Sequence, residues 1–373
     1  MKTSLKFRFM TVAMAIASVG FSSCGDDDEK EIELTANEKK IQAINESYVK
    51  DCITPVYKQL ADATFELQSA IATLQSAKTD ANVVNACNLW KSSRQYWEWS
   101  EAYLFGAADE YSIDPHIDTW PLDRTALQNL LDGAMTNVET QIANSDNLAG
   151  FHGLEYIIFR EGQPRQATVI TDNEMRYAVA VVADLVLNCC RLEAAWSGIA
   201  NISSAKQTLL KASAFNGEAD DFGERLSDKW DNRTTLSGLQ QIIEGFITIV
   251  DEVGNGKIGT PYNGEDVNYI ESPHAYNSIQ DFEDNIQGVK FCYLGKTNAA
   301  SAQSLSVSAY IREQDASTDQ RIIAGLDNCI SKIKAMPKPF VKNYTDAKVG
   351  EAVDALDELV QLLEYANNNL LEE

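Results

Sequence analysis

The chain has 373 residues, of which 45% are hydrophobic and 9% aromatic, and its formal net charge is −24 at pH 7. This length and composition are sufficient for one large or two medium hydrophobic cores. The acidic excess excludes nucleic acid as an expected partner, because phosphate binding requires a basic surface.

The first 23 residues have the pattern of a signal peptide. Three basic residues precede an apolar run over 9–19, which is too short for a typical membrane-spanning helix. Small residues then lead to Cys24 in a pattern that resembles the lipoprotein box of bacteria, and this implies cleavage before Cys24 and acylation of its thiol. The acidic segment 24–34 is expected to be a solvated tether, and it is similar to the surface-export signal of Bacteroidetes lipoproteins.

The rest of the chain is predicted to be α-helical, because apolar residues recur at spacings of three and four and no strand alternation is found. Pro55 should kink or split the first helical pattern, and 106–121 and 254–277 are expected to be irregular. The expected helices are 35–52, 56–74, 82–105, 122–142, 149–160, 171–196, 203–215, 217–230, 235–253, 278–294, 302–313, 318–334 and 347–371.

These helices predict an all-α fold made of two packed helical bundles, because long helices joined by short loops pack antiparallel. We expect an N-terminal bundle over 35–200 and a C-terminal bundle over 201–373. The six cysteines after Cys24 lie among apolar residues and are expected to be mostly buried free thiols. One disulfide bond between two of them is the alternative, and the sequence does not specify which pair would form it.

The apolar run 149–160 contains one imidazole and one carboxylate. His152 and Glu155 are three residues apart, so they project from the same face of a helix. Imidazole and carboxylate are common ligands of zinc and iron. The pair is therefore either a metal-binding pair or a hydrogen-bonded pair inside the core.

A complete peptidase motif is not found around this pair. The inverted zinc-peptidase motif H-x-x-E-H would need a histidine where Tyr156 stands. A di-iron site would need a second helix with a histidine, but His116 and His274 are both expected in loops. Any site must therefore receive groups from other segments.

The aromatic helix 82–105 is the first of two such segments. Arg94 and Glu101 lie among three tryptophans, where an unpaired charge would be costly to bury. We expect both to orient the His152 helix, whereas Glu98 is expected to be a solvated charge.

The second segment runs from 271 into the helix that follows. Ser278 and Asp281 match a capping box, and Asn285 lies one turn after Asp281. His274 precedes them in a polar loop and is expected at the surface.

Three ordered blocks of the sequence resemble the imelysin-like family over about residues 35–370. They are the G-x-H-x-x-E motif at 150–155, the Trp90…Arg94…Glu101…Phe105-Gly106 helix, and Ser278-x-x-Asp281-x-x-x-Asn285-x-x-Gly288. The resemblance implies two helical bundles with the motif near their interface. It also implies a bacterial envelope protein, because members of the family are envelope proteins. Several of them are linked to iron uptake or iron regulation, and the family carries a peptidase label.

Together these observations predict an envelope lipoprotein that binds iron, another divalent metal or an iron-containing ligand between two bundles. The expected metal ligands are His152 and Glu155, with the site lined or oriented by Arg94, Glu101, His274, Ser278, Asp281 and Asn285. Glu155 and Asp281 should approach each other across a cleft. The alternatives are a metallopeptidase that uses His152 and Glu155, and a non-catalytic interaction protein of the cell surface.

The expected location is the outer membrane, on its periplasmic or cell-surface face. The expected partners are the membrane itself, through a lipid on Cys24, and an outer-membrane transporter.

Overall fold

The computed structural model describes residues 34–371 except for 146, 216–220 and 229–233. The predicted signal peptide, Cys24 and nearly all of the tether therefore lie outside the described residues. From Ala36 onward the chain forms one compact unit. No helix of the described part is both long and apolar enough to cross a membrane.

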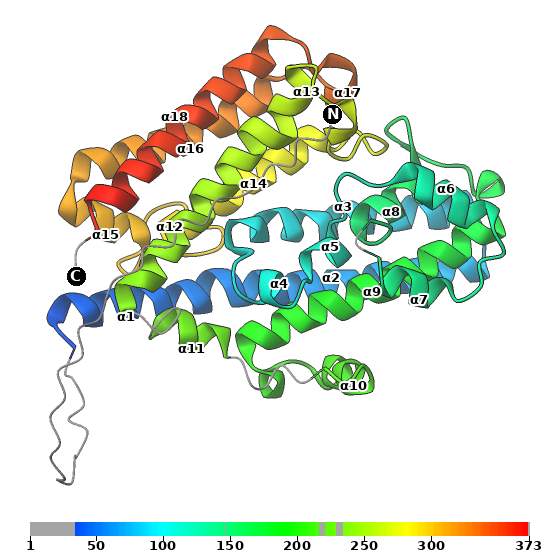
Figure 1. The fold of residues 1–373 in the computed structure, drawn as a ribbon, viewed down its shortest axis with the longest axis horizontal. Coiled ribbons are helices and arrows are strands. Elements are labelled where there is room, and N and C mark those ends of the chain that lie inside the picture. The colour runs from blue at the N-terminus through cyan, green and yellow to red at the C-terminus, as the bar shows by residue number, and fades with distance from the viewer. Residues whose placement is uncertain (1–33, 146, 216–220, 229–233, 372–373) are drawn as a thin grey trace, which may run out of the picture. The chain divides into compact units, whose positions relative to one another are not determined.

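The described part of this unit is almost entirely helical (Figure 1). The α-helices are α1 (Ala36–Tyr48), α2 (Thr54–Ser76), α3 (Asp80–Ser100), α4 (Ala107–Glu110), α5 (Asp114–Ile117), α6 (Arg124–Asp132), α7 (Val138–Ala143), α8 (Gly150–Ile158), α9 (Asp172–Ser197), α10 (Ser204–Ala212), α11 (Phe222–Ser227), α12 (Thr235–Asp251), α13 (Thr260–Tyr262), α14 (Ser278–Leu294), α15 (Val307–Gln314), α16 (Ala316–Ala335), α17 (Phe340–Asn343) and α18 (Ala347–Asn369).

Shorter 3-10 and π segments connect these helices. The 3-10 segments are η2 (Glu101–Tyr103), η3 (Ala167–Val169), η4 (Ile199–Asn201) and η8 (Val267–Tyr269), and the π segments are η1 (Val49–Ile53) and η7 (Glu252–Gly259). Two-residue strands β1 (Phe159–Arg160) and β2 (Gln163–Pro164) pair antiparallel just after α8. The all-α prediction is confirmed.

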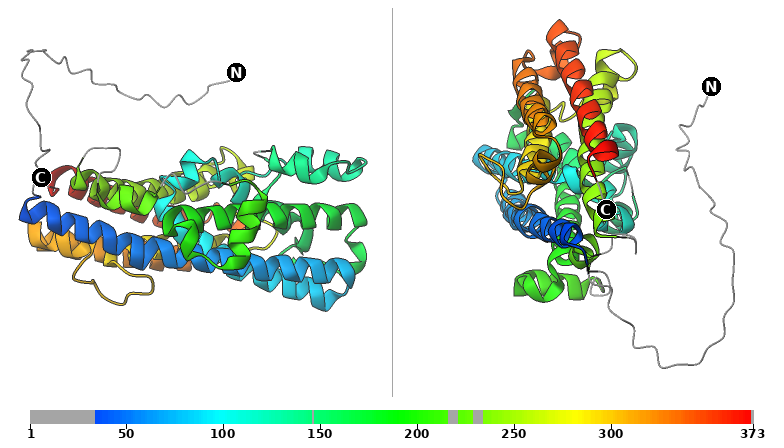
Figure 2. Two further views of the ribbon diagram at one scale, coloured as in Figure 1. Left: turned by 90° about the horizontal axis from the view of Figure 1, so that it is seen from below. Right: turned by 90° about the vertical axis from the view of Figure 1, so that its left-hand side faces the viewer.

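Two groups of helices pack side by side within the unit (Figures 1 and 2). In the first group α2 packs against both α3 and α9, and in the second α14 and α18 pack against α16 while α12 packs against α18. Helix α14 also packs against α3 and so joins the groups. Helix α1, which begins the described chain, packs against α12 of the second group. The division of the chain at residue 200 stays a prediction.

The first helical pattern keeps a helical backbone from α1 into α2. Between α1 and α2 the chain makes the π-helical turn η1, and Pro55 follows within the first turn of α2. A proline there has no N–H to donate, and the wider π turn accommodates its ring. The structure thus shows a local widening of the helix just before Pro55 in place of the predicted kink or split.

The segment 254–277 begins differently from the expected loop. Helix α12 continues through the π-helical segment η7, and α13 follows directly. The glycines of η7 permit close packing, since a Cβ on Gly254 would lie 3.2 Å from Leu356 of α18. This irregular helix carries Lys257 into the interior, where it is 1% exposed.

The cysteine prediction is confirmed in the described residues. All six cysteines that follow Cys24 are buried free thiols. Burial raises the pKa of Cys87 to about 12, so this thiol is in its unreactive neutral form.

Candidate functional site

Helix α8 places His152 and Glu155 in the protein interior, where they are 2% and 1% exposed. The helix begins at Gly150, whose φ is +76°, and a Cβ there would lie 2.2 Å from the carbonyl oxygen of Ile117. Only glycine permits this close approach and this backbone conformation. The contact brings Asp118, the next residue along, against the first turn of α8.

The imidazole of His152 is surrounded by three carboxylates. Its Nδ1 lies 3.3 Å from Oε2 of Glu155, and its Nε2 lies 2.7 Å from Oε1 of Glu271 and 3.1 Å from Oδ1 of Asp118. Ligand atoms of Asp118, His152 and Glu271 all lie within 4.8 Å of one another. One nitrogen and two carboxylates from three separate segments thus converge at one point of the interior.

Glu155 has a different set of partners. Its Oε1 accepts hydrogen bonds from the backbone N–H groups of His274 and Ala275, each 2.7 Å long. Glu155 therefore attaches α8 to the segment before α14 and holds the imidazole of His152 from the Nδ1 side. No contact joins Glu155 to Asp281 in the described part; Glu271, which contacts His152 and groups with Asp281, lies between them.

Arg94 on α3 is fully buried at the centre of the acidic groups. Its guanidinium lies 2.6 Å from Glu98, 2.5 Å from Glu271 and 3.9 Å from Asp281, and it also pairs with Asp118. The planar guanidinium can contact several carboxylates at once because its five N–H groups point in fixed directions. It connects Glu98 of α3 to Asp118 and Glu271, which lie in two separate loops.

Lys257 from η7 is the second buried cation. Its Nζ lies 2.8 Å from Glu101, 3.8 Å from Glu98 and 3.7 Å from Glu271. Asn285 of α14 donates to Oε2 of Glu98 and to Oε2 of Glu101, both at 2.7 Å. Helices from both groups thus contribute to one continuous network.

We call this network the buried ionic cluster. It holds more carboxylates than basic groups, so negative charge would be in excess if every carboxylate were ionised, even with the histidine protonated. Its carboxylates are Glu98, Glu101, Asp118, Glu155, Glu271 and Asp281, and its basic groups are Arg94, Lys257 and His152. An uncompensated buried charge is strongly unfavourable, so the cluster must bind either protons or a cation.

The pKa values in the cluster reflect this excess. Burial raises the pKa of Glu98 and of Glu101 well above the usual range, and it raises the pKa of Asp281 to about 7. Burial also acts to raise the pKa of Asp118, but Arg94 and His152 outweigh it and hold that pKa well below its usual value. The negative charge is therefore concentrated next to His152 and Arg94.

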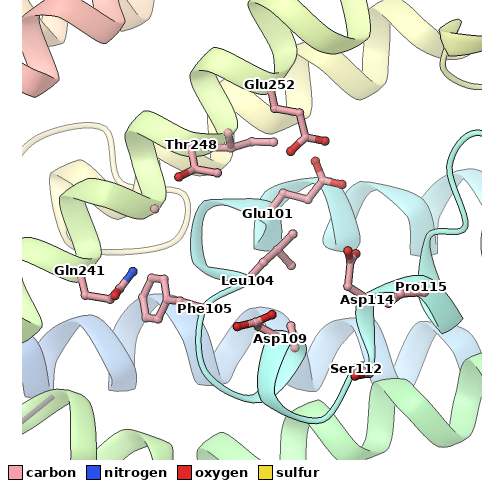
Figure 3. Close-up of a pocket in the computed structure, with 13 residues that line it drawn as sticks. Glu101, Leu104, Phe105, Asp109, Ser112, Asp114, Pro115, Gln241, Thr248 and Glu252 are labelled. Atoms are coloured by element: carbon pink, nitrogen blue, oxygen red, sulfur yellow. The ribbon is translucent and has the colours of Figure 1, made fainter. Parts of the chain in front are cut away.

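Two cavities reach the cluster at different ends. The His152 cavity, of about 320 Å³, ends on His152 and Glu155. The Glu101 cavity, of about 410 Å³, is lined at one end by Glu101, Asp114 and Glu252, whose carboxylates face one another in Figure 3. The buried groups are thus accessible to small ligands.

The remaining residues expected at the site lie around Glu271. Ser278 donates its hydroxyl to the carbonyl oxygen of Glu271 and does not cap α14; the N-cap residue is Asn277, which bonds Asp281 at 2.7 Å. The expected capping box is therefore wrong, because the hydroxyl of Ser278 is used to fix the loop. His274, expected at the surface, is partly buried and lines the His152 cavity.

Several groups of the cluster are not apparent from sequence. Glu98, expected to be solvated, is fully buried, because its i, i+4 spacing from Arg94 places both on the same inward face of α3. The i, i+4 spacing of Arg94 and Glu98 is the feature of the sequence that could have predicted this burial. Asp118, Glu271 and Lys257 lie in segments without helical periodicity, and only the tertiary contacts bring them together.

The fold and the site together define an all-α protein with an acidic ionic cluster buried between packed helices. The chain belongs to the imelysin family: the family model described as Imelysin, peptidase M75, matches residues 53–365. His116, expected in a loop, lies in the short helix α5 and pairs with Asp184 at 2.9 Å.

Similar proteins span nearly the whole chain. The iron-regulated protein A of Synechococcus elongatus is 25% identical over 94% of this chain and 89% of its own length. A crystal structure of a protein assigned as an iron-regulated protein A precursor from Parabacteroides distasonis has a TM-score of 0.79 at 24% identity, covering 91% of this chain and 97% of that one. An imelysin-like protein from Psychrobacter arcticum has a TM-score of 0.65 at 14% identity, covering 89% and 94%. The two structures support the fold.

Proposed function

We propose that this protein binds a divalent metal ion, with iron preferred, at the His152 end of the buried ionic cluster. The observation that carries the proposal is the excess of buried carboxylates over buried basic groups around one imidazole. A bound cation would compensate this charge without protonating the carboxylates.

The unsatisfied atoms of the cluster support a cation site. Oε2 of Glu271 and Oδ2 of Asp281 are buried without a partner in hydrogen-bond geometry. Nε2 of His152 is buried between the carboxylates of Glu271 and Asp118 but is not aligned for a hydrogen bond to either of them. Buried polar atoms are nearly always satisfied in proteins, so several such atoms in one place indicate a missing ligand. Nitrogen and carboxylate oxygen are also the donors that suit iron and similar divalent ions.

In this proposal the ligands are His152, Asp118 and Glu271, and the role of Glu155 is revised. Glu155 accepts two backbone N–H groups and contacts Nδ1 of His152, as expected for a carboxylate that orients a metal-binding histidine. Arg94 remains beside the two carboxylate ligands, because each carboxylate has lone pairs for both partners.

The preference for iron is supported by the name of the Synechococcus relative, which describes regulation by iron. We further propose that the protein acts in iron uptake as a lipoprotein of the outer membrane, anchored through Cys24 and serving a transporter there. The lipoprotein box and the acidic segment that follows it support this location.

Metal binding tests the proposal directly. Wild-type protein, purified without added metal, is titrated with Fe²⁺ under anaerobic conditions and with Mn²⁺ and Zn²⁺. We expect about one ion per chain for the wild type and none for His152→Ala. Glu155→Gln should weaken binding about 10- to 100-fold, as loss of an orienting group does.

His116→Ala is the matched control, because it removes a partly buried histidine that pairs with Asp184 outside the cluster. It should bind metal like the wild type. Circular dichroism verifies that each variant is folded. Equal and negligible metal uptake by wild type and folded His152→Ala would refute the proposal, and a lowered unfolding temperature of His152→Gln would then identify the motif as a structural pair.

A further inference from the structure

The Glu101 cavity combines apolar walls with an acidic end. Its volume of about 410 Å³ is in the size range of pockets for small organic ligands. Its walls include Leu104 and Ile249, and the carboxylates of Glu101, Asp114 and Glu252 face one another at one end (Figure 3). No lysine, arginine or histidine of the described part lines it. Such a cavity fits a ligand that has both an apolar body and positive charge.

The carboxylates at the acidic end have oxygens without a donor. The side chains of Asp114 and Glu252 are partly buried, and no hydrogen bond or ion pair joins either of them to another described residue. Glu101 is 6% exposed, and its Oε2 accepts from Lys257 and Asn285. Its Oε1 has no donor among the described residues. Polar atoms in such surroundings are normally satisfied, so the acidic end indicates a missing cationic ligand.

The pKa values at this end agree with uncompensated negative charge. Burial raises the pKa of Asp114 to about 7, the charges of Asp118 and Glu252 add to this effect, and Lys257 acts in the opposite direction. Burial also raises the pKa of Glu252. A cation bound between these carboxylates would favour their ionised forms, because an opposite charge nearby stabilises a carboxylate.

The spacing of the carboxylates favours an organic cation over a metal ion. Among the described residues, the acidic groups whose ligand atoms all lie within 4.8 Å of one another include neither Asp114 nor Glu252. A divalent ion holds each oxygen at about 2.0 to 2.6 Å and so draws its ligands together. Ammonium groups on one flexible chain can instead each bond a separate carboxylate. The methylene segments between them can pack on apolar walls, as lysine side chains do.

We propose that the Glu101 cavity binds an aliphatic polyamine, with one ammonium group held by Glu101 and Glu252 and another held by Asp114. The net charge of −24 adds a long-range attraction for such a cation. The inference does not rest on the proposed metal site, because none of the proposed metal ligands lines this cavity.

Isothermal calorimetry on the full chain tests the inference with three probes: putrescine, the neutral diol of the same length, and Mg²⁺. Wild type should bind putrescine at least about tenfold more tightly than the diol. Glu252→Gln and Asp114→Asn should each weaken putrescine binding at least about tenfold, as expected when a hydrogen bond to a charged group is lost. Both substitutions keep the size of the side chain and remove its charge, and circular dichroism verifies that the variants are folded.

Glu244→Gln is the matched control. Glu244 is also on α12, but it is exposed and does not line the cavity. This variant should bind putrescine like the wild type. Equal affinities of the wild type for putrescine and the diol, or unchanged putrescine affinity in both folded cavity variants, would overturn the inference. Binding of Mg²⁺ that is tighter than that of putrescine and is lost in Glu252→Gln would also overturn it and identify a metal site in this cavity.

Discussion

Asp284 is a buried carboxylate near the cluster that has no cation within ion-pair distance in the described part of the chain. Its Oδ1 accepts from Gln95 and Trp99, and its Oδ2 accepts from Gln280. Burial raises its pKa to about 6 from the ordinary value of 3.8, although the three hydrogen bonds act in the opposite direction. The folded state therefore favours the protonated form.

This shift predicts how stability depends on pH. Because the folded pKa is higher than the unfolded one, the native state binds more protons between pH 4 and 6, and the contribution of Asp284 is lost as pH rises through about 6. The shift corresponds to about 3 kcal/mol. Asp284→Asn should stabilise the protein at pH 7 by about 1 to 2 kcal/mol. This figure allows for the hydrogen bond from Gln280, which is weakened because an amide has one acceptor oxygen where the carboxylate has two.

Urea unfolding at pH 4 and at pH 7 measures the effect, which should be present at pH 7 and small at pH 4. Asp132→Asn, at an exposed position on α6, is the control and should change stability little at either pH. A destabilised Asp284→Asn protein at pH 7 would show that its negative charge is compensated in the native state.

Helix α14 approaches α3 so closely that only glycine fits at one point of their contact. A Cβ on Gly288 would lie 2.5 Å from the carbonyl oxygen and 2.7 Å from the Cα of Trp99. Both atoms belong to the backbone, so they cannot move away at low cost. The contact fixes the separation of the two helices that carry Glu98 and Asn285, which bond each other at 2.7 Å.

We therefore expect Gly288→Ala to destabilise the protein by about 1 to 3 kcal/mol, since overpacking outweighs the gain in helix propensity. Chemical denaturation measures the change. Gly325→Ala is the matched control: Gly325 is also helical, but its nearest neighbours are the flexible ends of Leu359 and Leu362, at 3.2 and 3.7 Å. An unchanged or raised stability of Gly288→Ala would mean that α3 and α14 can move apart without a loss of stability.

At the scale of the whole molecule, net charge and the predicted anchor act in opposite directions at a membrane. Removal of residues 1–23 takes away three positive charges and no negative one, which leaves a net charge of about −27. A chain of this charge is repelled by anionic lipid surfaces. Retention at the membrane would therefore depend on the lipid at Cys24.

Cys24→Ser should accordingly move the protein from the membrane fraction to the soluble fraction of the cell. Fractionation followed by immunoblotting measures the distribution, and Lys30→Gln in the tether is the control that should remain with the membrane. Recovery of Cys24→Ser in the membrane fraction would contradict the proposed lipid anchor.

The sequence alone determined the features that depend on neighbouring residues. The helical periodicity predicted the all-α fold. The residues Thr171-Asp172-Asn173-Glu174 also have the capping-box pattern, and the structure shows this capping box at the start of α9. The inward position of His152 and Glu155 also follows from the apolar residues that surround them on a single helix. These are local properties, because spacings of three and four residues and capping hydrogen bonds are set within one or two turns.

Only the tertiary structure decided which groups surround His152. Asp118 reaches it because Gly150 permits a backbone contact with Ile117, and Glu271 comes from a loop more than a hundred positions later. Lys257 enters through a π-helical segment within a region expected to be a loop. No periodic pattern encodes such contacts, since they depend on the packing of separate segments, and the charge balance of the cluster exists only once those segments have met.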